Sequence, residues 1–211
     1  EETIYKYLIN KFDFYLSLGY SRREFIEITL KFPTIYTYGI DNIKIKIDNM
    51  IKFGYSKRAI LKISKKVPVI FAYSIDSINA KIQNLIDYGY TKKDVIKMTT
   101  AFPLLFIYNF ELLSTKRDDI RALGYGKNDI IKMTKTFPQL YGLTNDNIKN
   151  KIDNFINVGY SYEDVIKMTK SFPMLFSLSV DNINLKKEQI MNMGYTSKQF
   201  LLMSKKFPTI Y

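Results

Sequence analysis

The chain has 211 residues, 46% of them hydrophobic and 25% charged, which is typical of one or two globular cores rather than of a disordered tail. Its 32 Lys and Arg residues outnumber 20 Asp and Glu residues, and the net charge of +12 favours polyanionic partners such as nucleic acid or an anionic membrane surface. Cysteine and histidine are absent, which excludes disulfides, thiolate or imidazole metal sites and Ser-His or Cys-His catalysis. We therefore expect no metal and no cofactor.

The chain contains no candidate membrane span or targeting segment. Its longest apolar run, FPLLFIYNF at 102–110, is far shorter than the roughly 20 residues that a spanning helix needs. The sequence begins at Glu1 without an initiator methionine, a signal peptide or a transit segment, so we expect a fragment or a processed form. The residues alone do not reveal the native compartment.

A strict internal repeat organises the chain. All six prolines are spaced 35 residues apart, and six of the nine glycines follow the same period, each with a tyrosine after it. The prolines are Pro33, Pro68, Pro103, Pro138, Pro173 and Pro208, and the glycines are Gly19, Gly54, Gly89, Gly124, Gly159 and Gly194. This period predicts a partial repeat at 1–18, complete repeats at 19–53, 54–88, 89–123, 124–158 and 159–193, and a partial repeat at 194–211.

Each repeat is predicted to contain a long helix, a short helical segment and a second long helix. In the repeat at 54–88, Ser56 opens the first helix, and Pro68 ends it because proline lacks an amide donor and restricts the residue before it. A short segment follows with the proline in its first turn. The second helix begins after Ser74 and ends at Gly89, where glycine permits a left-handed cap.

Capping boxes support the start of the first helix in three repeats. A Ser or Thr is followed three residues later by an acid, so hydroxyl and carboxylate can satisfy backbone amides reciprocally. The pairs are Ser21 with Glu24, Thr91 with Asp94 and Ser161 with Asp164. Because such units bury their apolar faces only by stacking, we predict an all-α solenoid, right- or left-handed, forming one domain over 1–211.

A lysine recurs at the margin of the apolar stripe of every second helix. In one of these helices Ile78, Ile82 and Leu85 form the stripe, and Lys81 lies at its edge. The equivalent lysines, eight residues before each repeat glycine, are Lys11, Lys46, Lys81, Lys116, Lys151 and Lys186. Stacking at about 10 Å would align their ammonium groups, and lysine binds phosphate as a point charge, so this lysine column predicts contacts along a nucleic-acid backbone. Alternatively, each lysine lays its methylenes on the core and places its charge in water or beside an acid of an adjacent repeat.

Two second helices depart from the pattern. Arg117 and Lys187 replace the aliphatic residue that follows the column lysine. Both are candidate phosphate or partner contacts, although Asp118 and Asp119 can equally neutralise the neighbouring bases.

Other recurring side chains are assigned to packing or to solvent. The hydroxyl ten residues after each repeat glycine, as in Thr99, is predicted to bond a carbonyl one turn earlier. The tyrosines after glycine and the aromatics after proline are predicted to pack rather than to stack on bases. Four lysines of the first helices are predicted to form a solvated outer face: Lys62, Lys97, Lys132 and Lys167.

The linked positions resemble the mitochondrial transcription termination factor (mTERF) family. The residues that carry the resemblance are the pattern GYxxxxIxxMxxxFPxLF and the following NIKxKIDxxIxxGY, and they extend over essentially the whole chain. The resemblance implies a left-handed superhelix of three-helix repeats with a positively charged concave groove that binds duplex DNA or, in some members, structured RNA. It also implies an organellar location, mitochondrial or other, and a role in transcription, its termination, ribosome assembly or splicing.

Three function hypotheses follow. The first is a monomeric solenoid that binds nucleic acid, duplex DNA in preference to RNA, without a membrane or small-molecule ligand. The second is a scaffold that binds an acidic protein partner, as many solenoids bind proteins. An enzyme is the least favoured, because the carboxylates recur at capping and solvent positions rather than in a catalytic constellation, and no catalytic residue is assigned.

Overall fold

The computed structural model describes residues 2–211, which contain twelve α-helices, six short 3₁₀ helices and no strand. The prediction of an all-α helical-repeat fold is confirmed. The chain divides into two compact units, an N-terminal unit that ends at Phe110 and a C-terminal unit that starts at Glu111. The handedness of the superhelix and the single domain over 1–211 stay predictions.

Every complete repeat has the predicted order of a long helix, a 3₁₀ helix that starts at the repeat proline, and a second long helix. We name the first long helices A helices and the second ones B helices. The A helices are α2 (Arg22–Lys31), α4 (Lys57–Lys66), α6 (Lys92–Ala101), α8 (Lys127–Thr136), α10 (Tyr162–Ser171) and α12 (Ser197–Lys206). The B helices are α1 (Glu2–Ser17), α3 (Ile40–Phe53), α5 (Ile75–Tyr88), α7 (Phe110–Ala122), α9 (Asn145–Val158) and α11 (Val180–Met191). The 3₁₀ helices are η1 (Pro33–Thr37), η2 (Pro68–Phe71), η3 (Pro103–Phe106), η4 (Pro138–Gly142), η5 (Pro173–Ser177) and η6 (Pro208–Ile210).

The helix ends follow the local signals of the sequence. Gly54 has φ 117°, and the Tyr55 amide donates to the Met50 carbonyl at 3.0 Å, so the left-handed glycine turns the chain back over the last turn of α3. The capping box is complete at Ser21 and at Thr91, and the Ser161 hydroxyl accepts from the Asp164 amide at 3.1 Å. These caps fix where α2, α6 and α10 begin.

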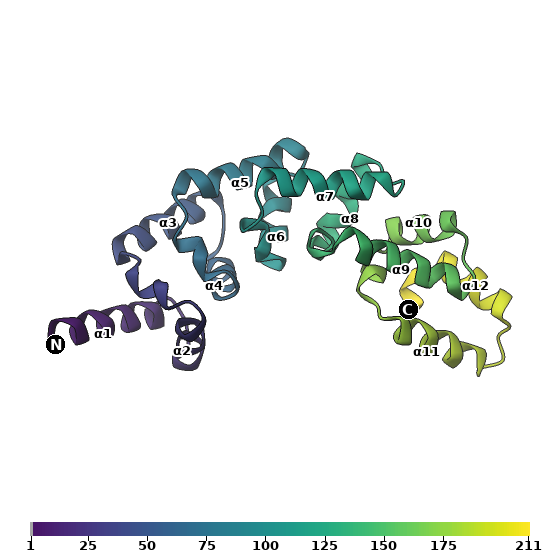
Figure 1. Ribbon diagram of the computed structural model, residues 1–211, viewed down its shortest axis with the longest axis horizontal. Coiled ribbons are helices and arrows are strands. Elements are labelled where there is room, and N and C mark those ends of the chain that lie inside the picture. Colours follow the sequence, from purple (N-terminus) through teal and green to yellow (C-terminus); the bar gives the residue numbers. More distant parts are fainter. Residues whose placement is uncertain (1) are drawn as a thin grey trace. The chain divides into compact units, whose positions relative to one another are not determined.

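Within each unit, helices of one kind pack on the next. In the N-terminal unit α4 packs on α6, and both lie on the same side of α3 and α5 (Figure 1). In the C-terminal unit α8 packs on α10, α10 on α12, and α9 on α11. The B-helix stripe is buried as predicted, since Ile78, Ile82 and Leu85 are at most 3% exposed. Apolar burial between successive repeats therefore builds the core.

Buried tyrosines connect successive repeats. The Tyr55 hydroxyl lies 2.7 Å from Thr99 Oγ1, and Thr99 Oγ1 lies 2.7 Å from the Val95 carbonyl. Because threonine has one hydroxyl proton and donates it to Val95, Tyr55 must be the donor to Thr99. The same contact joins Tyr20 to Ser64, Tyr125 to Thr169 and Tyr160 to Ser204. The predicted packing roles of the tyrosine and hydroxyl positions are confirmed for these pairs.

Candidate nucleic-acid interface

Four lysines of the predicted column reach a backbone carbonyl in the next repeat. The contacts are Lys46 Nζ to the Phe71 carbonyl at 2.5 Å, Lys81 to Tyr108 at 2.9 Å, Lys116 to Leu143 at 3.1 Å, and Lys151 to Leu178. Each carbonyl lies at or just after the end of a 3₁₀ helix, where backbone acceptors lack a helical partner. The lysine therefore crosses the margin of the core and bonds the end of the neighbouring repeat.

The ammonium groups of this column are partly withdrawn from water. Burial lowers the pKa of Lys46, of Lys81 and of Lys116. These four lysines therefore lay their methylenes along the core margin, as the alternative interpretation of the sequence predicted. Their ammonium groups bond a carbonyl in place of the water or the acid that the sequence suggested. A phosphate at these lysines would have to compete with that carbonyl, and phosphate contact by the column stays a prediction.

The two outer members of the column differ from these four. Lys11 is 2% exposed, and its ammonium group lies 5.4 Å from the centre of the Tyr7 ring. Its Nζ has no hydrogen-bond partner within residues 2–211. Lys186 is half-buried on α11. The column therefore does not place six equivalent cations at the surface.

The two residues that break the repeat pattern also have partners inside the C-terminal unit. Arg117 is 5% exposed, its Nε donates to the Tyr141 hydroxyl at 3.3 Å, and its guanidinium lies 5.8 Å from the centre of the Tyr141 ring. Lys187 donates to the Val158 carbonyl at 3.2 Å. Phosphate contact by Arg117 and Lys187 stays a prediction as well, and it would require both side chains to leave these positions.

The exposed cations gather instead on the A helices. These six helices hold 19 of the 32 Lys and Arg residues but six of the 20 Asp and Glu residues. The rest of the chain holds 13 basic and 14 acidic residues, so essentially all of the net charge of +12 belongs to the A helices. We name basic A face the exposed cations at the second, sixth and tenth positions of these helices: Arg23, Lys31, Arg58, Lys62, Lys66, Lys93, Lys97, Lys132, Lys167, Lys198 and Lys206.

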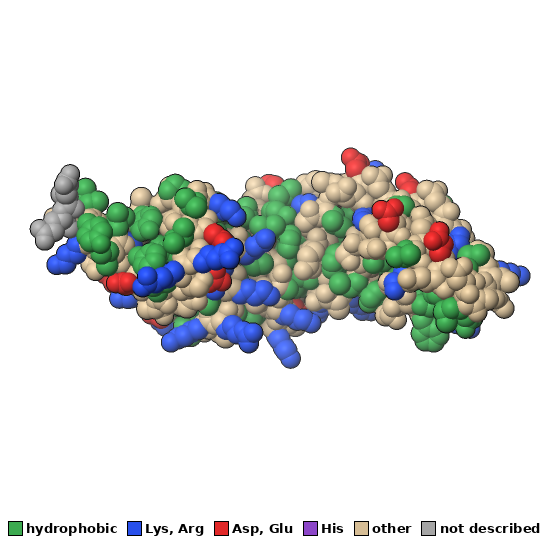
Figure 2. Space-filling view, turned by 90° about the horizontal axis from the view of Figure 1, so that it is seen from below, with side chains coloured by type: hydrophobic (Ala, Val, Ile, Leu, Met, Phe, Trp, Pro, Cys, Tyr) green, Lys and Arg blue, Asp and Glu red, His purple; other side chains and the backbone are tan. Residues whose placement is uncertain are grey.

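Helical spacing puts these cations on one side of each A helix. On α4, Arg58, Lys62 and Lys66 recur at i, i+4 and i+8 and are exposed, whereas Ile60 and Ile63 point into the core. This helix has five cations and no acid, the highest positive charge among the A helices. Figure 2 shows Lys and Arg side chains gathered on the face of the N-terminal unit that is seen from below Figure 1, the side on which α4 and α6 lie.

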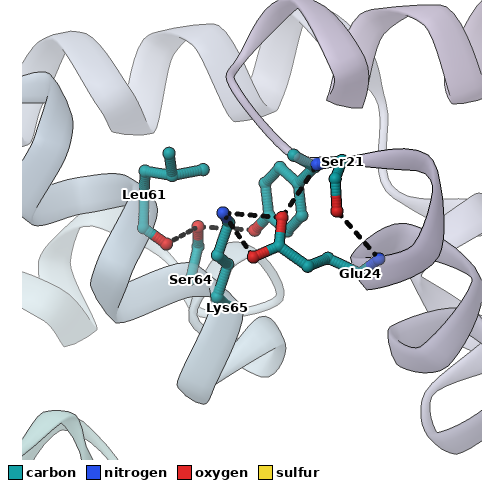
Figure 3. Close-up of polar contacts among 6 residues, drawn as sticks. Ser21, Glu24, Leu61, Ser64 and Lys65 are labelled. Atoms are coloured by element: carbon teal, nitrogen blue, oxygen red, sulfur yellow. Dashed lines mark hydrogen bonds and ion pairs between the residues drawn. The ribbon is translucent and has the colours of Figure 1, made fainter.

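Ion pairs between neighbouring A helices hold other cations off this face. Lys65 Nζ lies 2.8 Å from Glu24 Oε2, Lys170 lies 2.8 Å from Asp129, and Lys205 lies 3.2 Å from Asp164. Each acid is also the third residue of its A helix, so the capping position and the ion pair share one carboxylate. Figure 3 shows this arrangement for Glu24. The Lys65 ammonium, then the Ser21 amide, lowers the pKa of Glu24 to about 2. Within each unit, these pairs fix the register of the A helices that they join.

The sequence predicted that four lysines of the basic A face are exposed, but it was not used to identify that face as a candidate site. Lys62, Lys97, Lys132 and Lys167 are exposed, as predicted for a solvated outer side. The signal that could have identified them as a candidate site is the charge of each helix counted separately, because the B helices and connections are close to neutral.

Two other kinds of feature were sought among the described residues, a metal site and a membrane span. Residues 2–211 contain no group of three or more acidic side chains arranged to hold a metal ion. Within that range no helix has both the length and the apolar character of a membrane span. The basic A face is therefore the most distinctive chemical feature of the described surface.

Fold and face together define an α-helical repeat protein whose positive charge is concentrated on one set of helices. The mTERF family model matches residues 2–120 and 113–193, and the chain belongs to the mTERF family. This is a family of helical-repeat proteins that bind nucleic acid. A comparison with curated proteins found no match.

Proposed function

We propose that this protein binds the phosphate backbone of nucleic acid through the basic A face, prefers duplex DNA to RNA, and acts as a monomer in regulating or terminating transcription. The observation that carries the proposal is the separation of charge between the A helices and the rest of the chain. A face of lysines and arginines releases the counterions of a polyanion, which drives binding without sequence readout.

Repeat spacing supports a duplex ligand. Helices packed about 10 Å apart present one cation row for about every three phosphates of a strand, because phosphates follow one another at about 3.4 Å along the axis. The row spacing is set by stacked, ion-paired helices, so it suits a rigid, regularly charged ligand better than a flexible strand. Family membership supports a mitochondrion or another organelle as the place of action.

Three exposed cations of α4 provide the test. Arg58, Lys62 and Lys66 are changed together to glutamine, and Lys6, Lys52 and Lys149, which are exposed on B helices, are changed together as the matched control. Fluorescence anisotropy measures binding to a duplex of about 20 base pairs and to a matched RNA hairpin over a salt series. Each lost phosphate contact should lower the log-log salt slope by about 0.9, so the α4 variant should lose up to about 2.7.

The outcomes separate the hypotheses. Weaker binding by the α4 variant at an unchanged melting temperature, with the control close to wild type, supports the proposal. Equal losses in both variants would show that net charge alone matters, not the basic A face. Failure of the wild type to bind either ligand would favour a scaffold for an acidic protein, and tighter binding to the hairpin would reverse the preference for DNA.

A further inference from the structure

A cavity of ≈ 320 Å³ lies in the N-terminal unit, where α3 and α4 face the C-terminal end of α1. Its apolar walls include Leu18, Ile47, Ile60 and Leu61, and the lysine Lys57 also lines it. A cavity of this size lies in the range of sites that enclose small ligands or single side chains. Neither the lysine column nor the basic A face accounts for it.

The next repeat shows what fills the equivalent position. Thirty-five residues along, Leu18 is replaced by Phe53 and Lys57 by Lys92. There the Lys92 ammonium lies 4.9 Å from the centre of the Phe53 ring. The cavity beside Leu18 is therefore a position at which this repeat design accommodates an aromatic ring under a lysine.

The two positions share a facing aliphatic residue but differ in where the lysine lies, since a β-carbon on Gly54 would lie 3.4 Å from Lys92 Cε and one on Gly19 would have no Lys57 atom within 4 Å. A β-carbon placed on Gly19 would lie 3.0 Å from Leu61 Cδ2, and one placed on Gly54 would lie 3.2 Å from Ile96 Cδ1. Leu61 and Ile96 are themselves 35 residues apart. The first position therefore differs from the second in two ways, a leucine in place of the phenylalanine and a lysine that does not lie over it.

In the C-terminal unit an equivalent pair has its aromatic residue at the other position. There Leu123 corresponds to Leu18, but Tyr162 replaces the lysine, and its hydroxyl donates to the Leu123 carbonyl at 3.0 Å. Leucine is thus accompanied by an aromatic residue in this pair, whereas the next equivalent pair, Val158 and Ser197, contains no ring. The pair of Leu18 and Lys57 contains no ring of its own.

We propose that the cavity beside Leu18 binds an aromatic side chain, phenylalanine or tyrosine, presented by a protein partner. The ring would lie against Leu18 and Leu61 beneath the Lys57 ammonium, as Phe53 lies beneath Lys92. Burial of a ring removes a large apolar surface from water, and the cation over its face adds to the attraction. The charged lining residues are Lys44, Asp48 and Lys57, and Lys44 also lies 3.6 Å from Asp41, so recognition rests on the ring rather than on charge around the cavity.

The position of the cavity favours a protein over a nucleobase. Lys57, Ile60, Leu61 and Ser64 line it and recur at i, i+3, i+4 and i+7 on α4. Arg58, Lys62 and Lys66 lie on a different side of the same helix. A nucleic acid that follows the basic A face would therefore not pass over the cavity, and the inference does not depend on nucleic-acid binding.

Small probes test the site on the whole chain. Methyl NMR spectra are recorded while N-acetylphenylalaninamide or N-acetyltyrosinamide is added, and in parallel thymidine or adenosine. We expect saturable shifts of Ile47, Ile60 and Leu61 with the two amides, with a Kd on the order of 1 mM for ligands of this size. The nucleosides should leave these methyl groups unshifted.

Two substitutions taken from the repeat itself provide the controls. Leu18→Phe should fill the cavity from within, raise the melting temperature and weaken amide binding at least about ten-fold. Phe53→Leu should open the equivalent position and add a second set of shifts at Ile96, which tests the site even if Leu18→Phe fails to fold. Amide binding that Leu18→Phe leaves unchanged, no shifts in the wild type, or shifts with nucleosides alone would each overturn the proposal.

Discussion

Lys81 Nζ donates a hydrogen bond of 2.9 Å to the Tyr108 carbonyl, 27 residues further along the chain. The same relationship recurs at Lys46, Lys116 and Lys151. It joins a B helix to the end of the following 3₁₀ helix, so a side chain that looks like a phosphate ligand in the sequence connects two repeats. A substitution of Lys81 can therefore distinguish a role in the stability of the fold from a role in nucleic-acid binding.

Replacing Lys81 by methionine should destabilise the fold and leave nucleic-acid affinity nearly unchanged. Methionine keeps an unbranched stem at the core margin and removes the donor to the carbonyl, a loss of about 1–3 kcal/mol in the free energy of unfolding. Urea unfolding and anisotropy binding measure the two effects on the same preparation. The reverse result, full stability with weakened binding, would support the phosphate prediction for the lysine column.

Changes within the basic A face should differ in effect between the two units. The pair Arg58 and Lys62 lies on α4, which has no acid, whereas Lys167 lies on α10 beside Glu163, 3.9 Å away. One variant has glutamine at Arg58 and Lys62, and the other has glutamine at Lys132 and Lys167. The loss of duplex affinity should be about three-fold or more greater in the first variant, because neighbouring positive charges reinforce the local potential on α4. Equal losses for the two pairs, measured by anisotropy at one salt concentration, would contradict a dominant role for α4.

Acid should weaken the contact between α2 and α4. The pKa of Glu24 is about 2 in the folded protein against an ordinary value of 4.5, because Lys65 and the Ser21 amide stabilise the carboxylate. A lowered pKa gives a stabilisation that is fully present above about pH 4.5 and is lost as the pH falls towards 2. Wild type should therefore lose stability more steeply than Glu24→Gln in this window.

Urea midpoints at several pH values measure this difference. Glu27→Gln, which changes another acid of α2, is the control and should follow the wild-type curve closely. Parallel curves for wild type and Glu24→Gln would show that the ion pair in Figure 3 does not contribute to the acid response.

The buried hydroxyl pair in the N-terminal unit should be energetically coupled. Thr99→Val removes the acceptor of the Tyr55 hydroxyl and should cost about 1–3 kcal/mol, since a buried donor is left without its partner. Tyr55→Phe should cost less, because the Thr99 hydroxyl keeps its bond of 2.7 Å to the Val95 carbonyl. A double-mutant cycle by chemical denaturation should give a coupling of about 0.5–1.5 kcal/mol.

The pH dependence provides a second test of this pair. Burial raises the pKa of Tyr55 to about 12, while the Thr99 contact lowers it in part. Because the folded pKa exceeds the ordinary value of 10, this contribution to stability is complete below pH 10 and is lost as the pH rises through 12. Tyr55→Phe should therefore flatten the loss of stability between pH 10 and 12, and an unchanged slope would show that other tyrosines dominate it.

The sequence by itself determined the repeat, its helices and their ends. The 35-residue spacing of proline and glycine, the Ser or Thr caps and the stripe of Ile78, Ile82 and Leu85 act over one or two turns of chain, so they can be read locally. Per-helix charge, which places the basic A face, could have been counted from the sequence as well.

Only the tertiary structure decided what the column lysines contact. Lys81 has the same sequence context whether its ammonium meets a phosphate or the Tyr108 carbonyl, because the acceptor lies 27 residues away and is brought near by stacking of repeats. The ring-sized cavity beside Leu18 likewise depends on how α3 and α4 pack against the end of α1. Local patterns specify helices, whereas contacts between helices depend on side-chain volumes and on polar groups that meet only when the repeats are assembled.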